Sequence, residues 1–333
     1  MLGIGRREFI ALLGGAAAAW PLAARAQQGE RVRRIGVLWG VAPENRTFLS
    51  YRMAFTQTLR EAGWTEERNV TIDHRWSVTD ADRLRSYAAE LVALAPDVLV
   101  GDSSPSTAAL LGQTRTIPIV FARVADPLGS GFVESFARPG RNATGFTNHE
   151  LTMGGKWVEL LKEIVPSVAR VALIYNPRTA PFTASYLPSL ESAARLRAIK
   201  LIDAAVDGPA ELETIVAAQA AEPGGSLVAQ TDAFVTLHRD LIISLAARHR
   251  LPAIYPARQF VEAGGLASYG NASIEMYRGA AAYVDRILRG ARPADLPVQA
   301  PTKFEFAINL TTAKALGLEV SPTLLARADE VIE

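Results

Sequence analysis

Short apolar runs alternate with amphipathic stretches along most of the chain. The first run, Ile35–Trp39, is closed by Gly40, and similar runs occur at Val98–Val100 and Ile117–Phe121. Runs of this kind, bounded by turn residues, are typical of strands buried on both faces of a sheet. Between them, apolar positions spaced near 3.6 residues predict helices. The alternation indicates an α/β fold with parallel sheets covered by helices on both sides.

The same rhythm starts again after about residue 147. Further strands are predicted at Arg170–Tyr175, Leu201–Asp203, Ser226–Ala229 and Pro252–Tyr255. The two halves correspond at nearly constant offsets, because Ile35 maps to Val171 and Pro118 maps to Pro252. This pattern favours two similar α/β lobes over one large sheet, which is the alternative.

The first residues are typical of an export signal. Arg6 and Arg7 precede the apolar stretch Phe9–Ala24, and Ala24-Arg25-Ala26 matches an A-x-A cleavage site. The paired arginines resemble the signal of the twin-arginine route. Pro21 interrupts the stretch, which is shorter than the ~20 residues that span a bilayer. We therefore predict that residues 1–26 are cleaved near Ala26 and that the protein is periplasmic, without membrane insertion; a membrane anchor is the alternative.

Composition removes several classes of function. Hydrophobic residues make up 49% of the 333 residues and charged residues 21%, so the chain can bury sizeable cores. A formal net charge of +1 argues against a nucleic-acid partner, which usually demands a basic excess. The absence of Cys excludes disulfides and thiolate sites. The four His residues show no zinc-binding spacing, so no metal site is expected.

Signatures of enzymes are also missing. The chain has no G-x-S-x-G nucleophile motif, no phosphate-binding loop and no H-E-x-x-H. A nicotinamide-dependent enzyme would carry a glycine fingerprint after its first strand, where this chain reads Trp39-Gly40-Val41-Ala42-Pro43. We therefore expect a protein that is not an enzyme and needs no cofactor.

Polar side chains at the ends of the predicted strands are candidates for ligand binding, because parallel sheets bind ligands beyond their carboxyl ends. Ser103 and Ser104 begin a helix, where hydroxyl and backbone N–H groups hold a carboxylate; ordinary helix capping is the alternative. Asp126 and Asp232 are candidates for an ammonium group, with a turn and a cap as the alternatives.

Aromatic side chains near the same strand ends are candidate walls for a flat ligand. They are Trp39, Tyr175, Phe234, Phe260 and Tyr269, with Asn176 beside Tyr175 as a donor and acceptor. Core packing is the alternative for each aromatic residue.

Several segments in order resemble the periplasmic substrate-binding proteins of ABC transporters, in the tryptophan/tyrosine-type branch. They are Thr116–Phe121, Asp126–Gly131, Ala137–Phe146, Gly154–Lys156, Ala263–Gly270 and Ile308–Leu318. The resemblance covers nearly all of the chain from Arg33 onward. It departs from the family at Asp102-Ser103-Ser104-Pro105, where a small residue, Thr and Pro are more usual.

The resemblance implies a type I periplasmic-binding fold, with two Rossmann-like lobes joined by crossover hinges. Crossovers are expected near Thr144–Thr147, near Tyr269–Asn271 and in the segment 293–297. Residues 31–145 and 271–297 would form the first lobe, residues 146–270 and 298–333 the second, with a ligand cleft between them.

The function implied by the resemblance is capture of a small organic solute for an ABC permease and its ATPase. The solute is expected to be an amino acid or a related carboxylate, and an aromatic one fits the candidate walls. A periplasmic ligand sensor on the same fold, docking to a membrane receptor, is one alternative. An enzyme on a doubly wound fold is the other.

Overall fold

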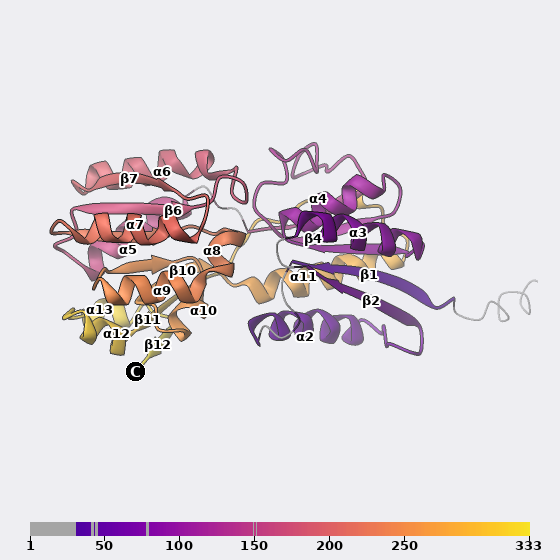
Figure 1. Ribbon diagram of the computed structural model, residues 1–333. Helices are drawn as coiled ribbons and strands as arrows, with labels where there is room; N and C mark the ends of the chain where they lie inside the picture. Colours follow the sequence, from indigo (N-terminus) through magenta and orange to yellow (C-terminus); the bar gives the residue numbers. More distant parts are fainter. Residues whose placement is uncertain (1–30, 41–42, 44–45, 78–79, 149, 151) are drawn as a thin grey trace, which may run out of the picture.

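Two α/β lobes lie side by side in the computed structural model (Figure 1). It describes residues 31–40, 43, 46–77, 80–148, 150 and 152–333. The predicted export signal, residues 1–26, lies outside the described residues. Within the described ranges, no helix combines the length and the apolar character needed to cross a membrane.

The first lobe is built on a five-stranded parallel sheet of order β2-β1-β3-β4-β5. Its strands are β1 (Arg33–Trp39), β2 (Val70–Trp76), β3 (Val98–Asp102), β4 (Ile119–Val124) and β5 (Ala143–Thr147). Its helices are α2 (Arg46–Glu61), α3 (Ala81–Ala93), α4 (Ser104–Gln113), α11 (Ser273–Leu288) and the 3₁₀ helix η1 (Pro293–Asp295). Helix α11 comes from late in the chain and packs on α2, β4 and β5.

The second lobe is built on a seven-stranded sheet of order β12-β11-β10-β9-β8-β6-β7. Its strands are β6 (Arg170–Tyr175), β7 (Lys200–Ala205), β8 (Gly225–Ala229), β9 (Ala253–Tyr255), β10 (Ala267–Asn271), β11 (Phe304–Asn309) and β12 (Glu330–Ile332). Its helices are α5 (Met153–Ile164), α6 (Thr183–Leu196), α7 (Pro209–Ala220), α8 (Ala233–Leu237), α9 (Arg239–Arg248), α10 (Arg258–Glu262), α12 (Leu310–Ala315) and α13 (Pro322–Leu325). Only the β10–β11 pair is antiparallel among these described strands, because the chain enters β11 from the other lobe.

Each sheet carries a separate apolar core on each of its two faces. Along β6, Val171 and Leu173 pack under α5 and α6, whereas Ala172 and Ile174 pack under α7 to α9. The sheet of the first lobe is covered by α2 and α11 on one face and by α3 and α4 on the other. The predicted α/β architecture with two lobes and parallel-dominated sheets is confirmed.

The chain crosses between the lobes after β5, after β10 and between η1 and β11. The crossings are hydrogen-bonded to one another. The side-chain amide of Asn271 donates to the carbonyl oxygen of Asn148 at 3.1 Å. The backbone N–H of Thr147 donates to the carbonyl oxygen of Gln299 at 3.0 Å. The segments that join the lobes therefore form one connected hinge.

The segments predicted as crossovers mostly lead into the crossings. Residues 144–147 belong to β5, which ends two residues beyond the expected boundary of the first lobe, and residues 269–271 belong to β10. The Pro-rich segment forms η1, which contacts β5 in the first lobe.

Candidate functional site

The carboxyl ends of the two sheets border a cleft between the lobes. The first lobe contributes Phe48 and Tyr51 from α2 and Arg123 from the end of β4. The second lobe contributes Gln259 and Phe260 from α10, which follows β9. The enclosed volume is about 30 Å³, whereas small-molecule sites usually measure ~300 Å³ or more. The lobes must therefore move apart before a ligand can enter.

Arg123 reaches the cleft because the backbone of β4 is irregular there. The register between β4 and β5 shifts between Ala122 and Val124. Arg123 itself has a φ of 58°, in the left-handed region that non-glycine residues seldom adopt. A bulge of this kind redirects the side chain relative to a regular strand. The local backbone thus presents the guanidinium to the cleft.

A buried carboxylate stands behind the guanidinium. Asp102 Oδ1 accepts a hydrogen bond from the Tyr277 hydroxyl at 2.5 Å, and Oδ2 accepts one from the backbone N–H of Gly40 at 3.2 Å. Nη1 of Arg123 lies 3.5 Å from both Asp102 Oδ1 and the Tyr277 oxygen. The guanidinium also stacks over the Phe48 ring, 4.6 Å from its centroid. Burial and the Asp102 carboxylate raise the pKa of Tyr277 well above its usual value, so its hydroxyl keeps the proton that it donates.

Aromatic rings form much of the wall in the first lobe. Tyr51 stacks on Tyr277 with ring centroids 4.9 Å apart and an interplanar angle of 14°. Phe48 meets Tyr51 edge to face at 5.2 Å. Burial raises the pKa of Tyr51. The rings offer a flat apolar surface next to a cation, an arrangement suited to an aromatic ligand that carries an anionic group.

Ser103 occupies the strained position of the predicted carboxylate loop. Its φ of 87° and ψ of 163° fall in a region that is essentially limited to glycine. Its carbonyl oxygen accepts hydrogen bonds from the backbone N–H and the hydroxyl of Thr107. Its side chain makes no capping bond to α4, and the Ser104 hydroxyl accepts from the backbone N–H of Ala125 at 3.3 Å. Neither serine lines the closed cleft, so their ligand role stays a prediction.

The structure places Trp39 and Tyr175 in the cores rather than on the cleft wall. The Trp39 side chain is 1% exposed and continues the apolar face of Ile35 and Val37 toward α2 and α11. Tyr175 is 9% exposed and continues the face of Val171 and Leu173. Side chains alternate along a strand, and at both strand ends the alternation points the ring into the core.

The Asp232 carboxylate is occupied by protein donors. Oδ2 accepts from the backbone N–H of Asn176 at 2.8 Å. Oδ1 accepts from the Thr179 hydroxyl at 2.5 Å and from the backbone N–H of Phe234 at 3.1 Å. Burial raises the pKa of Asp232, and these hydrogen bonds oppose that rise. The side chain thus caps α8, as in the alternative considered above, and does not line the cleft.

Both lobes use an aspartate to tie neighbouring strand ends together. Asp102 at the end of β3 binds the N–H of Gly40 after β1, and Asp232 after β8 binds the N–H of Asn176 after β6. The Asn176 side chain accepts from the N–H of Arg178 and donates to the Asp207 carbonyl oxygen, which shapes the loop. The duplicated contact reflects the internal similarity of the lobes.

Asp126 lies in a turn, which was the alternative to an ammonium-binding role for this residue. Its Oδ1 accepts a hydrogen bond from the backbone N–H of Gly129 at 2.8 Å. Asp126 is partly exposed and does not line the closed cleft. Of the predicted site residues, Phe260 is the one that borders the cleft, and its ring is fully buried and stacks on Tyr255 in the core of the second lobe.

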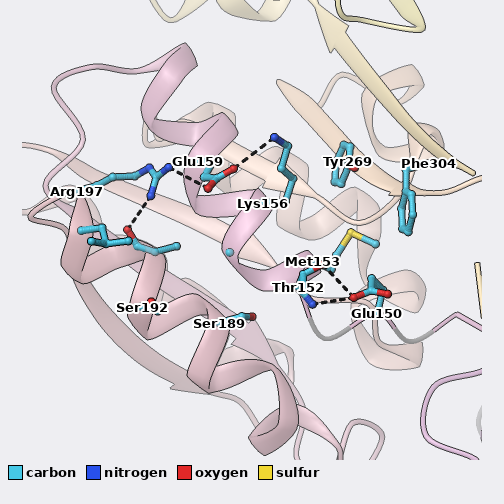
Figure 2. A pocket seen from close by; sticks show the side chains of 13 residues that line it. Glu150, Thr152, Met153, Lys156, Glu159, Ser189, Ser192, Arg197, Tyr269 and Phe304 are labelled. Atoms are coloured by element: carbon cyan, nitrogen blue, oxygen red, sulfur yellow. Dashed lines mark hydrogen bonds and ion pairs between the residues drawn. The ribbon is translucent and has the colours of Figure 1, made fainter. Parts of the chain in front are cut away.

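Tyr269 faces a second hollow, of about 560 Å³, beside α5 and α6 (Figure 2). It stacks on Phe304 with ring centroids 5.8 Å apart. Three of its charged groups are paired, because Glu159 binds Lys156 at 3.3 Å and Arg197 at 3.0 Å. The hollow is larger than the closed cleft, but its lining residues come from the second lobe alone. The cleft between the lobes is therefore the candidate ligand site.

Phe48, Tyr51 and Arg123 border the cleft but were not predicted from the sequence. In α2 the buried face runs through Phe48 and Phe55, whereas Met53 is 66% exposed. The signal for Arg123 was a basic residue within the apolar run of β4. Among the described residues, no group of three or more His, Asp or Glu is placed to hold a metal ion.

A sequence profile for ABC transporter substrate binding proteins matches residues 41–332. The chain belongs to this family. A Tyrosine-binding protein of Clostridioides difficile (strain R20291) is similar to this substrate-binding protein, with 25% identity over 268 residues, 80% of this chain and 76% of that one.

Solved structures show the same similarity. A conserved domain protein from Vibrio cholerae shares 30% identity and a TM-score of 0.83, over 90% of this chain and 100% of the other. An ABC domain from Streptococcus pneumonia, solved in complex with L-Trp, shares 25% identity and a TM-score of 0.83, over 90% and 99% of the chains.

These comparisons confirm the predicted family and the type I periplasmic-binding fold. The protein is a solute-capturing component of ABC transport. Its family is one of substrate-binding proteins and not of enzymes. A substrate-binding protein of an ABC importer works outside the cytoplasm, where it meets its solute.

Proposed function

We propose that this substrate-binding protein captures an aromatic amino acid between its lobes and delivers it to the permease of an ABC importer. The observation that carries the proposal is the composition of the cleft. Phe48 and Tyr51 on the first lobe provide aromatic surface, and Arg123 provides a cation. Rings bury a large area with few rotatable bonds, and the cation selects for a carboxylate.

The relatives support this class of ligand. The similar protein of Clostridioides difficile is named for tyrosine binding, and the similar domain of Streptococcus pneumonia was solved with L-Trp. We propose an aromatic amino acid as the ligand of this chain as well, because aromatic side chains line its cleft.

The remaining parts of the proposal concern location, partners and domain division. We propose export by the twin-arginine route, cleavage near Ala26, a periplasmic location, and a permease and ATPase as partners. No enzymatic step or cofactor is needed. The lobes are proposed to follow the predicted division, with the first lobe extended to Thr147 because β5 ends there.

A thermal-shift screen tests the ligand class. The set should contain L-tryptophan, L-tyrosine, L-phenylalanine, L-leucine, L-glutamate and several sugars. A ligand at ~100 times its dissociation constant stabilises the folded state by about 2.7 kcal/mol, which raises Tm measurably. We expect the aromatic amino acids to give the largest shifts. Stabilisation by sugars alone would contradict the amino-acid proposal while leaving membership of the family intact.

Variants of the aromatic wall sharpen the test. Phe48→Leu should weaken binding of the aromatic amino acid by about 2- to 10-fold, the usual worth of a ring–ring contact. Phe132→Leu is the matched control, because Phe132 is similarly buried in the same lobe but lies outside the cleft. Equal losses in both variants would mean that Phe48 acts only through stability.

Small-angle scattering tests the movement of the lobes. The closed cleft is too small for an amino acid, so the ligand-free protein should be more open in solution. A saturating ligand should reduce the radius of gyration. An unchanged radius would contradict closure around the ligand.

A further inference from the structure

We infer that the cleft recognises both charges of a free α-amino acid through three side chains on three different parts of the molecule. Arg123 in the first lobe binds the carboxylate. The side-chain oxygens of Asn148 at the hinge and Gln259 in the second lobe bind the ammonium group. The inference rests on the proposed function and specifies which chemical groups of the ligand are read.

The placement of Arg123 leaves its hydrogen-bonding face available. The Asp102 side chain is 1% exposed and lies behind, whereas the Arg123 side chain is 17% exposed and lines the cleft. Among the described residues, Nη1 makes the two 3.5 Å contacts, and Nε and Nη2 donate to no protein oxygen. A guanidinium offers two parallel N–H groups that match a carboxylate. The free edge of Arg123 therefore suits a ligand carboxylate.

Two acceptors in the cleft have no donor among the residues that the structure describes. Asn148 is 8% exposed, and its Oδ1 is buried without a hydrogen-bond partner among the described residues. Both backbone polar groups of Asn148 are hydrogen-bonded. Its N–H donates to the carbonyl oxygen of Val124, and its carbonyl oxygen accepts from the side-chain amide of Asn271. Oε1 of Gln259 is likewise buried without a donor in the described part of the chain. Both residues line the cleft.

An ammonium group is the donor that fits these oxygens. A buried acceptor without a donor destabilises the protein, and a charged N–H donor forms a stronger bond than a neutral one. The carboxylates considered for this role are engaged elsewhere, because Asp232 caps α8 and Asp126 closes a turn. The two amide oxygens without donors are therefore the acceptors that we assign to the ammonium group.

The charge balance of the cleft favours a zwitterion. Arg123 and Asp102 together carry no net charge, and an α-amino acid carries none either. A simple carboxylic acid or amine would leave an unbalanced charge in a closed, buried site, which is unfavourable. Because Arg123 and Gln259 belong to opposite lobes, a ligand that binds both holds the two lobes together around itself.

Calorimetric titration of the mature protein with L-tryptophan, tryptamine and indole-3-propionate tests the inference. Arg123→Gln should weaken L-tryptophan by about 30-fold or more, the usual loss for a buried charge pair, and should leave tryptamine within about 3-fold. Gln259→Met and Asn148→Leu should each weaken L-tryptophan by about 10-fold and leave indole-3-propionate within about 3-fold. Arg123→Lys should bind L-tryptophan more tightly than Arg123→Gln but less tightly than the wild type, since lysine keeps the positive charge but lacks the paired N–H groups of the guanidinium.

Arg258→Gln is the matched control, because Arg258 lies at the start of α10, pairs with Glu262 and does not line the cleft. Thermal unfolding without ligand verifies that each variant is folded. The inference is wrong if Arg123→Gln keeps its affinity for L-tryptophan, or if it loses affinity equally for L-tryptophan and tryptamine. Neither result would contradict the proposed function. If the wild-type protein binds no aromatic amino acid, the proposed function fails first. The same variants are then titrated with the amino acid that does bind.

Discussion

Protonation of His74 is expected to destabilise the first lobe in mild acid. His74 lies on β2, and its Nδ1 accepts a hydrogen bond from Trp39 Nε1 at 3.0 Å. The two rings lie 6.0 Å apart at 30°. Burial, with a smaller contribution from the positive charge of Arg52, lowers the pKa of His74 from 6.5 to about 4. The folded protein therefore holds this imidazole in its neutral form above that pH.

The sign and size of the effect follow from linkage. In the unfolded chain the His74 pKa returns to about 6.5, so the unfolded state takes up a proton first as the pH falls. The stabilising contribution is fully present above pH ~6.5 and is lost between ~6.5 and ~4. The free energy of unfolding should fall by about 2 kcal/mol between pH 7 and pH 5 from this group alone.

Urea unfolding at pH 7, 6 and 5 measures the effect. The comparison is with His74→Asn, which keeps a side-chain acceptor for Trp39 but cannot titrate. The wild-type protein should lose about 2 kcal/mol more than this variant between pH 7 and pH 5. His249→Asn is the control, because His249 follows α9 in the second lobe and does not contact Trp39. Parallel pH profiles for the wild type and His74→Asn would refute the reasoning.

Three further predictions use other contacts. Asp232→Ala should lower the free energy of unfolding by about 2 kcal/mol or more in urea unfolding, since it leaves buried donors unpaired. Calorimetry should show that the same variant changes the ligand Kd by less than about 3-fold. Gly270→Ala should destabilise by about 1–3 kcal/mol in urea unfolding, because its Cβ would meet a backbone carbonyl. Gly112→Ala, which meets nothing within 4 Å, is its control and should not destabilise. Replacing Arg6 and Arg7 by Lys should leave the precursor in the cytoplasm, as fractionation would show; normal periplasmic accumulation would contradict twin-arginine export.

The central strands β3, β6 and β8 were predictable because both of their faces are buried. Each appears in the sequence as a short apolar run, and β6 has the predicted bounds Arg170–Tyr175. The short strand β12 (Glu330–Ile332) was not predicted, because it has three residues, is partly exposed at the edge of its sheet and lacks an apolar run. The family was predictable because its motifs occur in order along nearly the whole chain.

The cleft residues were less predictable, for two physical reasons. An unbroken apolar run does not mark which face its last side chain joins, so Trp39 and Tyr175 were equally compatible with cleft and core. The residues that do line the cleft depend on long-range packing. Phe48 lies on a helix that α11 fixes from more than 200 residues away, and Arg123 depends on a bulge that exists only when β4 pairs with β5.

The late origin of α11 has a consequence for biosynthesis. Its Tyr277 and Val284 share a buried cluster with Phe55 and Val120 of the first lobe. The 125 residues between β5 and α11 leave the ribosome first, which takes roughly 6 to 25 s at ~5–20 residues per second. During that interval the apolar faces of α2 and β4 lack their partner. The sheet of the second lobe also waits for β11, so both lobes are completed by the last part of the chain. Neither lobe can therefore complete its buried core before α11 and β11 have been synthesised.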